Sequence, residues 1–215
     1  MTDLAAARRN MVDGQIRTSD VTDLRLIGAM LDLPREQFVA PGLAYLDLDV
    51  PVGEGRSARR MLKPMVLAKL IQAADIGAAD RVLDVACATG YSTGLLARLA
   101  GDVVALEDDP QLARSAKQRL SAVANAKVVT GSLSTGWPAA APYDAILVNG
   151  MTEIVPKALC DQLKDGGRLV CIFGSGPGAK ATLFLRSGNE VGRRALFDAA
   201  AARLPGFVRP PAFVF

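Results

Sequence analysis

Two acidic side chains stand where apolar runs end, on either side of a turn made of small residues. Asp84 leads into the turn 85–90, which reads VACATG, and Glu107 ends a second run that covers residues 103–106. A buried strand, a small-residue turn that opens a helix, and an acid about 20 residues further on are how an α/β sheet holds an adenosine-containing cofactor. An acid in the first turn would repel a pyrophosphate but suits the cationic S-adenosylmethionine. The pattern therefore favours methyl transfer over hydride transfer.

Alanine occupies two positions of this turn at which nucleotide-binding loops normally have glycine. These are Ala86 and Ala88, whereas Gly90 is present. Glycine tolerates a positive φ and a close ligand, and alanine costs about 1 kcal/mol or more where that conformation is required. In an alternative interpretation, the small residues only let a strand and a helix cross, and Asp84 caps the helix. The turn alone leaves both interpretations open.

Composition excludes several other kinds of chemistry. The 215 residues include no histidine, which removes Ser-His-Asp and Cys-His catalysis. The three cysteines, at positions 87, 160 and 171, lack the spacing of metal ligands, so we expect no metal. A net charge of +3 does not require a nucleic-acid partner, and 5% aromatic residues leave little for base stacking. Composition therefore does not favour nucleic acid as a partner.

Alternating apolar runs and helical patterns are expected to position the acidic residues. Strands of continuous apolar residues separated by helices predict a parallel sheet covered on both faces. The predicted strands cover residues 82–85, 103–107, 127–130, 145–148 and 168–173. Asp165-Gly166-Gly167 is expected as the turn into the fifth strand, and residues 181–186 and 191–197 as a closing pair of strands around 187–189.

Helix signals define the remaining elements. Residues 1–40 read as helical, with Asp20 as the cap of a helix that ends before Pro34. Residues 46–55 alternate and then become rich in glycine, which predicts a short strand and a mobile loop. Pro64 and the pair Asp109-Pro110 are expected to open two further helices. We expect residues 1–63 to pack on a main domain of residues 64–215 as one structural unit.

Five motifs, in their order and spacing, resemble the protein-L-isoaspartate O-methyltransferase family over nearly the whole chain. They are residues 11–16 (MVDGQI), 33–39 (LPREQFV), the turn 82–91, residues 136–148 with GWP and PYDAILV, and residues 163–170 (LKDGGRLV). The resemblance implies a class I S-adenosylmethionine-dependent methyltransferase fold, a Rossmann-like doubly wound sheet with an N-terminal helical extension. It also implies a protein repair activity that esterifies L-isoaspartyl carboxylates. Such a carboxylate is already ionised at neutral pH, so this reaction needs no histidine.

The resemblance also implies which residues form the site. The cofactor-binding residues would be Asp84, Ala86, Ala88, Gly90, Glu107 and Ser132, of which Ser132 stands where the family has an aspartate that contacts adenine. The family's catalytic loop, with the pattern Thr-Ile-Ser-Gln-Pro, corresponds to residues 56–64, and Leu62 stands where the family has serine. Ser57 and Arg59 are then expected to approach the substrate carboxylate.

Four cations gather beside the expected site: Arg56, Arg59, Arg60 and Lys63. They could bind a carboxylate, an acidic peptide or a phosphate, or they could form a solvated loop. The altered loop also leaves two alternative functions open, a methyltransferase of a small metabolite or RNA and a non-catalytic binding module. The N-terminus has no signal-peptide pattern and no stretch reaches the ~18 apolar residues of a membrane span, so we expect a cytoplasmic protein.

Overall fold

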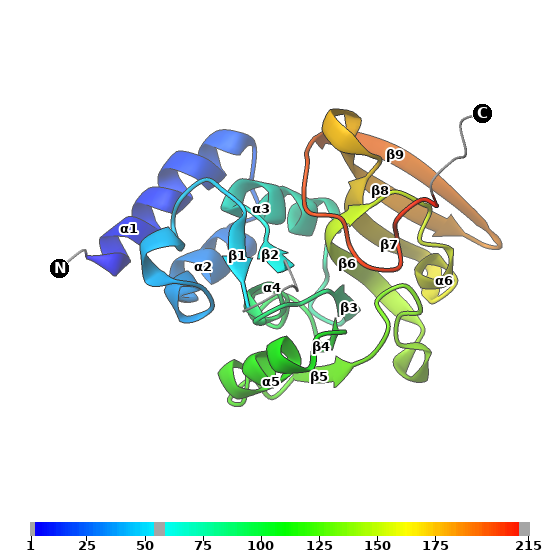
Figure 1. The fold of residues 1–215 in the computed structure, drawn as a ribbon, viewed down its shortest axis with the longest axis horizontal. Coiled ribbons are helices and arrows are strands. Elements are labelled where there is room, and N and C mark those ends of the chain that lie inside the picture. Colours follow the sequence, from blue (N-terminus) through cyan, green and yellow to red (C-terminus); the bar gives the residue numbers. More distant parts are fainter. Residues whose placement is uncertain (1–2, 54–58, 211–215) are drawn as a thin grey trace.

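A seven-stranded sheet organises the chain in the computed structural model, which describes residues 3–53 and 59–210 (Figure 1). The strand order is β5-β4-β3-β6-β7-β8-β9. The strands are β3 (Arg81–Val85), β4 (Asp102–Glu107), β5 (Ala126–Thr130), β6 (Tyr143–Thr152), β7 (Leu163–Phe173), β8 (Lys180–Ser187) and β9 (Glu190–Asp198). Neighbours among the first five in this order run parallel, and β8 and β9 are antiparallel. The predicted α/β fold and the closing strand pair are confirmed.

Helices and a small second sheet complete the fold. The α-helices are α1 (Leu4–Met11), α2 (Leu24–Asp32), α3 (Pro64–Ala73), α4 (Tyr91–Leu96), α5 (Pro110–Arg119) and α6 (Lys157–Cys160). The shorter helices are η1 (Val12–Ile16), η2 (Arg17–Ser19), η3 (Arg35–Gln37), η4 (Pro41–Leu43), η5 (Pro138–Ala140) and η6 (Gly176–Gly178). Strands β1 (Val50–Val52) and β2 (Arg59–Met61) pair with each other. No helix among the described residues is long and apolar enough to cross a membrane.

One local prediction is wrong, and a second is right in part. Asp20 does not cap α2, because the chain turns there through a left-handed conformation with φ 61°. The cap is Asp23, whose carboxylate accepts from the Arg25 backbone N–H at 2.8 Å directly before the helix. The prediction for residues 165–167 is right in part: β7 already begins at Leu163, but Gly166 has φ 74° and regular pairing with β6 resumes at Arg168, where the strand is predicted to begin. The loop predicted to follow β1 falls mainly on residues 54–58, outside the described residues.

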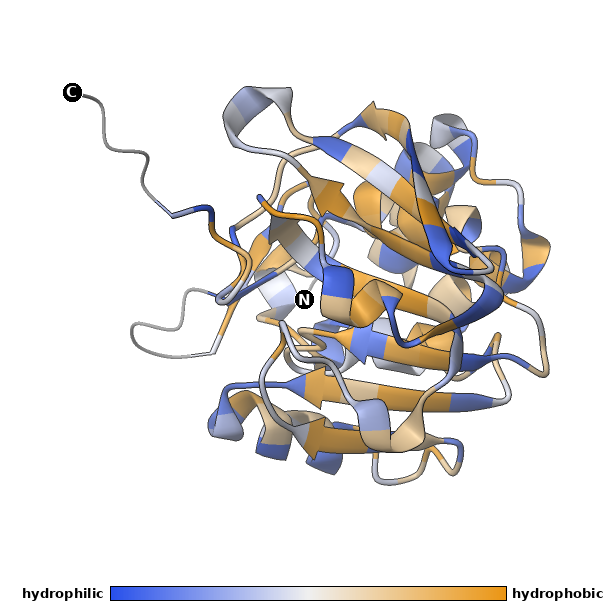
Figure 2. Cartoon of the chain, turned by 90° about the vertical axis from the view of Figure 1, so that its right-hand side faces the viewer, coloured by the Kyte–Doolittle hydropathy of each residue, from blue (hydrophilic) through white to orange (hydrophobic). Residues whose placement is uncertain are grey.

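Side chains on the two faces of the sheet enter two separate apolar cores. On one face, Val82 of β3 and Val170 of β7 belong to the cluster that also holds Met11, Met30 and Leu67 of the N-terminal helices. The residues that alternate with these along each strand point to the other face of the sheet, where they pack with Tyr143 and Phe207. Figure 2 shows that apolar residues run along the strands of the sheet.

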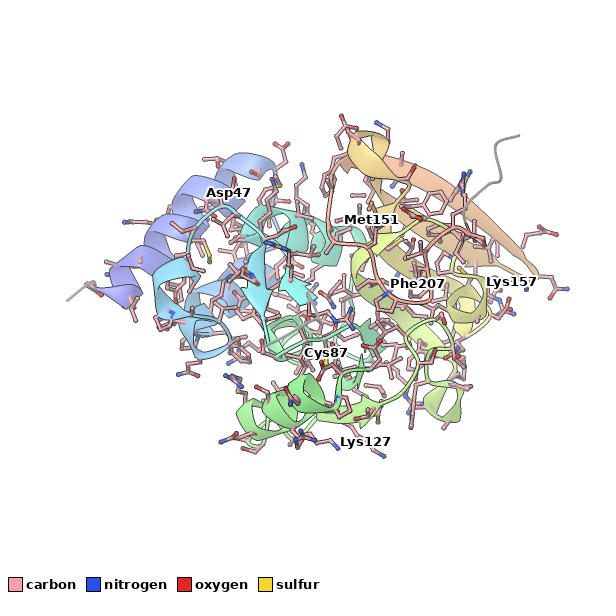
Figure 3. The ribbon with its side chains drawn as sticks, viewed as in Figure 1. Asp47, Cys87, Lys127, Met151, Lys157 and Phe207 are labelled. Atoms are coloured by element: carbon pink, nitrogen blue, oxygen red, sulfur yellow. The ribbon has the colours of Figure 1, made fainter. Side chains whose placement is uncertain are left out.

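A C-terminal strap, defined here as residues 199–210, lies along the carboxyl end of β6. The backbone of Met151 donates to the Ala202 carbonyl at 2.9 Å and accepts from Leu204 at 3.0 Å, and Glu153 donates to the Phe207 carbonyl at 2.8 Å. The side chains of Leu204 and Phe207 are buried, and Figure 3 labels Phe207 of the strap and Met151 of β6. The apolar segment 204–207 therefore packs on the body of the molecule, whereas residues 213–215 lie outside the described residues.

Candidate functional site

The turn after β3 keeps a glycine-type backbone although two of its residues are alanines. Ala86 has φ 58°, Ala88 has φ 51° and Gly90 has φ 96°. Left-handed conformations cost a residue with a Cβ about 1–2 kcal/mol. The pairing of β3 with β4 and β6 holds the turn at the carboxyl edge of the parallel strands, which is where open α/β sheets bind ligands.

Asp84 is buried beneath this turn and ties three elements together. Its carboxylate accepts from Ser92 Oγ at 2.8 Å, from Thr93 Oγ1 at 2.6 Å and from Asn149 Nδ2 at 2.6 Å. Burial raises the pKa of Asp84 to about 6, and these hydrogen bonds oppose the rise. The side chain thereby fixes the start of α4 and the end of β6 against the turn. A simple cap would bind backbone N–H groups, so these side-chain contacts give Asp84 a wider role.

Glu107 is fully buried at the end of β4, two strands from β6. Its Oε2 accepts from the Ala88 backbone N–H at 2.8 Å, and its Oε1 accepts from the backbone N–H groups of Asp108 at 3.0 Å and Asp109 at 3.2 Å. Burial raises its pKa, and the charge of Arg59 opposes that shift. The turn and the acid at the end of the second strand are thus joined by a direct hydrogen bond.

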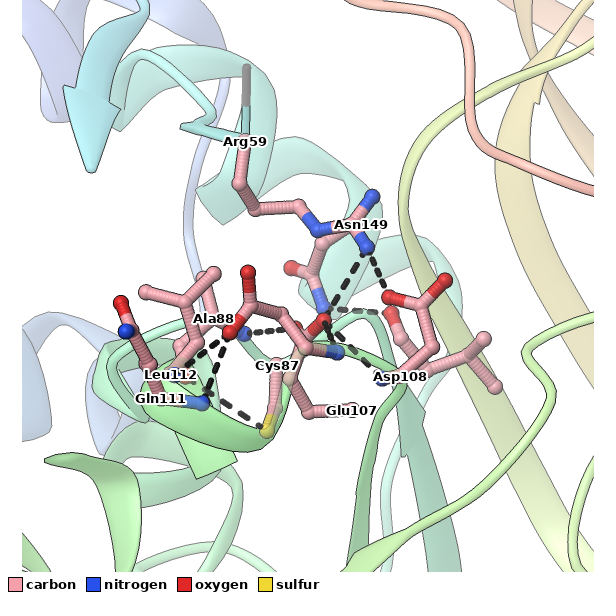
Figure 4. Close-up of polar contacts among 10 residues, drawn as sticks. Arg59, Cys87, Ala88, Glu107, Asp108, Gln111, Leu112 and Asn149 are labelled. Carbon is pink, nitrogen blue, oxygen red and sulfur yellow. Dashed lines mark hydrogen bonds and ion pairs between the residues drawn. The ribbon is translucent and has the colours of Figure 1, made fainter. Parts of the chain in front are cut away.

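Arg59 enters the same site from β2 (Figure 4). Its Nη2 donates to Glu107 Oε1 at 3.0 Å and also forms an ion pair with Asp108. The side chain is only 8% exposed, and its Nε has no hydrogen-bond partner in the described part of the chain. Arg59, one of the four cations predicted to gather beside the site, therefore points into the protein and pairs with Glu107 and Asp108. Arg60 donates to the Asp49 carbonyl at 3.1 Å, and Arg56 lies outside the described residues.

The remaining predicted residues lie at the same edge of the sheet or outside the described chain. Ser132 follows β5 and is exposed, with its Oγ 3.3 Å from that of Ser134. Gly131 beside it donates its backbone N–H to the Glu107 carbonyl at 3.1 Å, which brings this loop next to the acid. Leu62, which stands at the position of the family's serine, is buried. Ser57 falls within residues 54–58, which the structure does not describe.

Asn149 and Arg35 were missed by sequence reasoning. Asn149 donates to Asp84 and, at 3.0 Å, to the Val85 carbonyl. The available signal was a polar residue directly after the apolar end of a strand that neighbours β3. Arg35 is fully buried and lies over the Tyr91 ring at 4.8 Å, with Nη2 on the Leu62 carbonyl at 2.8 Å. Burial lowers its pKa, and no sequence signal pointed to a buried arginine.

The three cysteines are buried thiols. Burial and the nearby charges of Asp84 and Glu107 hold the pKa of Cys87 well above its usual value. Burial also raises the pKa of Cys160 to about 11 and that of Cys171 to about 12. A thiolate is the reactive form of cysteine, so Cys87 serves as a small packing residue of the turn. Among residues 3–53 and 59–210, no cluster of three or more His, Cys, Asp or Glu side chains could hold a metal ion.

Comparison with known proteins places this arrangement in a family. The family model for protein-L-isoaspartate(D-aspartate) O-methyltransferase matches residues 6–193. A protein-L-isoaspartate O-methyltransferase 1 from Geotalea uraniireducens (strain Rf4) is 37% identical over 192 residues, which are 87% of this chain and 86% of the relative. A protein-L-isoaspartate O-methyltransferase from Methanoculleus marisnigri is 39% identical over 172 residues, which are 78% of this chain and 77% of the relative.

Solved structures agree on the fold. A protein-L-isoaspartate O-methyltransferase structure superposes with a TM-score of 0.82 at 22% identity and covers 93% of this chain and 66% of that one. A Plasmodium falciparum protein assigned to the same class, in complex with S-adenosyl-L-homocysteine, gives a TM-score of 0.79 at 18% identity over 95% of this chain and 99% of that one. The family model ends at residue 193, so the C-terminal strap lies beyond the matched region.

Proposed function

Because this chain belongs to the protein-L-isoaspartate(D-aspartate) O-methyltransferase family, we propose that it methylates L-isoaspartyl carboxylates of damaged proteins with S-adenosylmethionine as the donor. The observation that carries the proposal is the left-handed turn 86–90, hydrogen-bonded to a fully buried Glu107 at the carboxyl edge of the sheet. This is the cradle in which an α/β sheet receives an adenosine-containing ligand.

The residues at this edge fit the donor. The turn keeps three positive φ angles even where its side chains are alanine, so its backbone has the shape that lets a ligand approach closely. Glu107 offers carboxylate oxygens for ribose hydroxyls, and the exposed Ser132 can meet the adenine. Asp84 holds the turn in place through Ser92, Thr93 and Asn149.

In the proposed reaction, the main task of the protein is to bind the donor and the acceptor and to orient them. S-adenosylmethionine supplies an activated methyl group on a positively charged sulfur. The acceptor carboxylate is ionised at neutral pH, so no side chain has to remove a proton. Alignment of the two reactants accounts for the catalysis in this scheme. We assign the approach to the acceptor carboxylate to Arg59 and Ser57, and this assignment stays a prediction.

Transfer of labelled methyl groups tests the proposal. The full-length protein, incubated with labelled donor, is expected to label a peptide with an L-isoaspartyl residue and to leave the same peptide with an ordinary aspartyl residue unlabelled. Label in RNA or small metabolites alone would favour a different acceptor. A folded protein that binds neither donor nor S-adenosyl-L-homocysteine would favour the non-catalytic binding module. Both of these results contradict the proposed activity.

The acceptor in this proposal is a polypeptide, and the reaction calls for neither a metal nor nucleic acid. The Glu107 and Asp108 carboxylates near the site favour a cationic donor over a polyanionic ligand. A cytoplasmic location and the division at residue 63 stay predictions from the sequence.

A further inference from the structure

Arg59 already occupies the carboxylate that the proposed donor would use. Its guanidinium reaches Glu107 Oε1 at 3.0 Å and pairs with Asp108, which is beside Glu107 on the same strand end (Figure 4). Arg59 is 8% exposed, and Glu107 has no exposed surface. The contact is therefore an internal ion pair at the carboxyl edge of the sheet.

Oε1 of Glu107 has no free acceptor position. A carboxylate oxygen offers about two such positions, and Oε1 accepts from Arg59 and from the backbone N–H groups of Asp108 and Asp109, whereas Oε2 accepts from the backbone N–H of Ala88. The three backbone donors belong to the turn and to the start of α5, so they cannot leave without changing the fold. Arg59 is the donor that a change of side-chain rotamer can remove.

The Arg59 pair is incompletely satisfied on its arginine side. Its Nε is buried and has no partner among the described residues. A buried donor without a partner loses its hydrogen bonds to water and gains no hydrogen bond within the protein. The side chain also borders a small cavity of about 10 Å³, lined in addition by Asn149, Gly150 and Arg203. The guanidinium is thus held strongly at one nitrogen and poorly at another.

We infer that Arg59 is a displaceable internal ligand that sets the affinity for the donor by competing with its ribose for Glu107. The inference rests on the proposed function. Donor binding breaks the contact of Arg59 with Glu107, and a ribose hydroxyl donates to Oε1 in its place. Asp108 helps to keep Arg59 on Glu107, because it pairs with the guanidinium. Asp108 is not needed for the contact between Glu107 and the turn.

Titration calorimetry with S-adenosyl-L-homocysteine tests this inference. The ligand lacks the sulfonium charge, and its ammonium and carboxylate groups cancel in net charge, so its overall attraction to the freed acids is weaker than that of the donor. Arg59→Met is expected to bind it about 10-fold more tightly than the natural protein, which corresponds to about 1.4 kcal/mol. Asp108→Asn, which weakens the competitor and keeps Glu107, is expected to bind a few-fold more tightly.

A matched control removes the same charge elsewhere. Arg81→Met breaks an exposed pair with Asp102 at the start of the strands and is expected to leave the affinity unchanged. If the natural protein binds the ligand and neither Arg59→Met nor Asp108→Asn binds it more tightly, the inference is overturned while the proposed function stands. If Arg59→Met does not fold, Asp108→Asn decides the same question. If neither the natural protein nor any folded variant binds the ligand, the proposed function is overturned and the inference with it.

Discussion

Ala86 and Ala88 hold a backbone shape that alanine disfavours. Their φ angles of 58° and 51° sit in the left-handed region. The Ala88 N–H must point at Glu107 for the turn to meet the acid, and this contact, at 2.8 Å, is made at the cost of backbone strain. The strain resides in the turn proposed to cradle the donor.

Restoring glycine at both positions is expected to stabilise the protein. Glycine relieves the left-handed strain but adds freedom to the unfolded chain, so we expect a net gain of about 1 kcal/mol for Ala86→Gly with Ala88→Gly. Such a gain raises the melting temperature by a few degrees in a chain of this size, which differential scanning calorimetry measures. The donor should also bind more tightly. Ala6→Gly in the regular helix α1 is the control and should lose up to about 1 kcal/mol.

The buried carboxyl group of Asp84 makes a second prediction, on pH dependence. Its pKa is about 6 in the folded chain against 3.8 for the unperturbed group, so the folded state binds its proton more tightly. Its contribution to stability is therefore full below about pH 4 and is lost as the pH rises through 6. Relative to Asp84→Asn, the free energy of unfolding of the natural protein should fall by up to about 3 kcal/mol between about pH 4 and pH 7. Urea unfolding at several pH values measures it, and parallel curves for the two proteins would contradict it.

At the scale of elements, the C-terminal strap depends on a glycine in β6. A Cβ built on Gly150 would lie 2.6 Å from Leu204 Cγ, a distance that side chains do not tolerate. The absence of a side chain at this position lets the buried Leu204 lie directly over the strand that carries Asn149. One close approach thereby determines how the segment after β9 returns to the site edge.

A double-mutant cycle tests this dependence. Gly150→Ala should cost about 1–3 kcal/mol because the strap must move, and amide exchange at Met151 and Glu153 should become faster. Leu204→Ala should cost about 2–5 kcal/mol through the cavity that it leaves. Together the two changes should cost less than their sum, because the new methyl group enters the space that Leu204 vacates. Strictly additive costs would show that the two residues do not share that space.

At the scale of the whole molecule, the N-terminal helices share a core with the sheet. Gln72 of α3 accepts from the backbone of Thr22 at 2.6 Å and donates to the Asp20 carbonyl at 2.9 Å, which secures the turn before α2. Met11 and Met30 pack into the same apolar cluster as Val82. The free energy that holds these helices is therefore tied to the integrity of the sheet.

Unfolding should consequently be a single transition. Trp137 is the one tryptophan and lies with the core on the opposite face of the sheet from the N-terminal helices. Its fluorescence and the far-ultraviolet circular dichroism should therefore change at the same urea concentration. Gln72→Ala should lower both midpoints together. An earlier loss of helical signal, with Trp137 fluorescence unchanged, would mean that residues 1–63 unfold separately.

The parts of the fold that the sequence predicts are those with local causes. Apolar runs define the strands, and Pro64 and Asp109-Pro110 open helices because proline suits the first turn. The pairing of Arg59 with Glu107 joins residues 48 positions apart, and no local pattern encodes it. Asp20 and Asp23 are equally good capping residues in sequence, so only the path of the chain selects between them. The alanine-rich start of the strap likewise carries no periodic signal.

The three cysteines have a consequence for chemical labelling. Each thiol is buried, and burial raises its pKa above the ordinary value for cysteine. Maleimides and mild oxidants attack the exposed thiolate, so the folded natural protein offers them a poor target. A cysteine introduced on the exposed strand β9 would then carry a fluorophore at one defined place. Distance measurements from that dye need no prior removal of the native thiols.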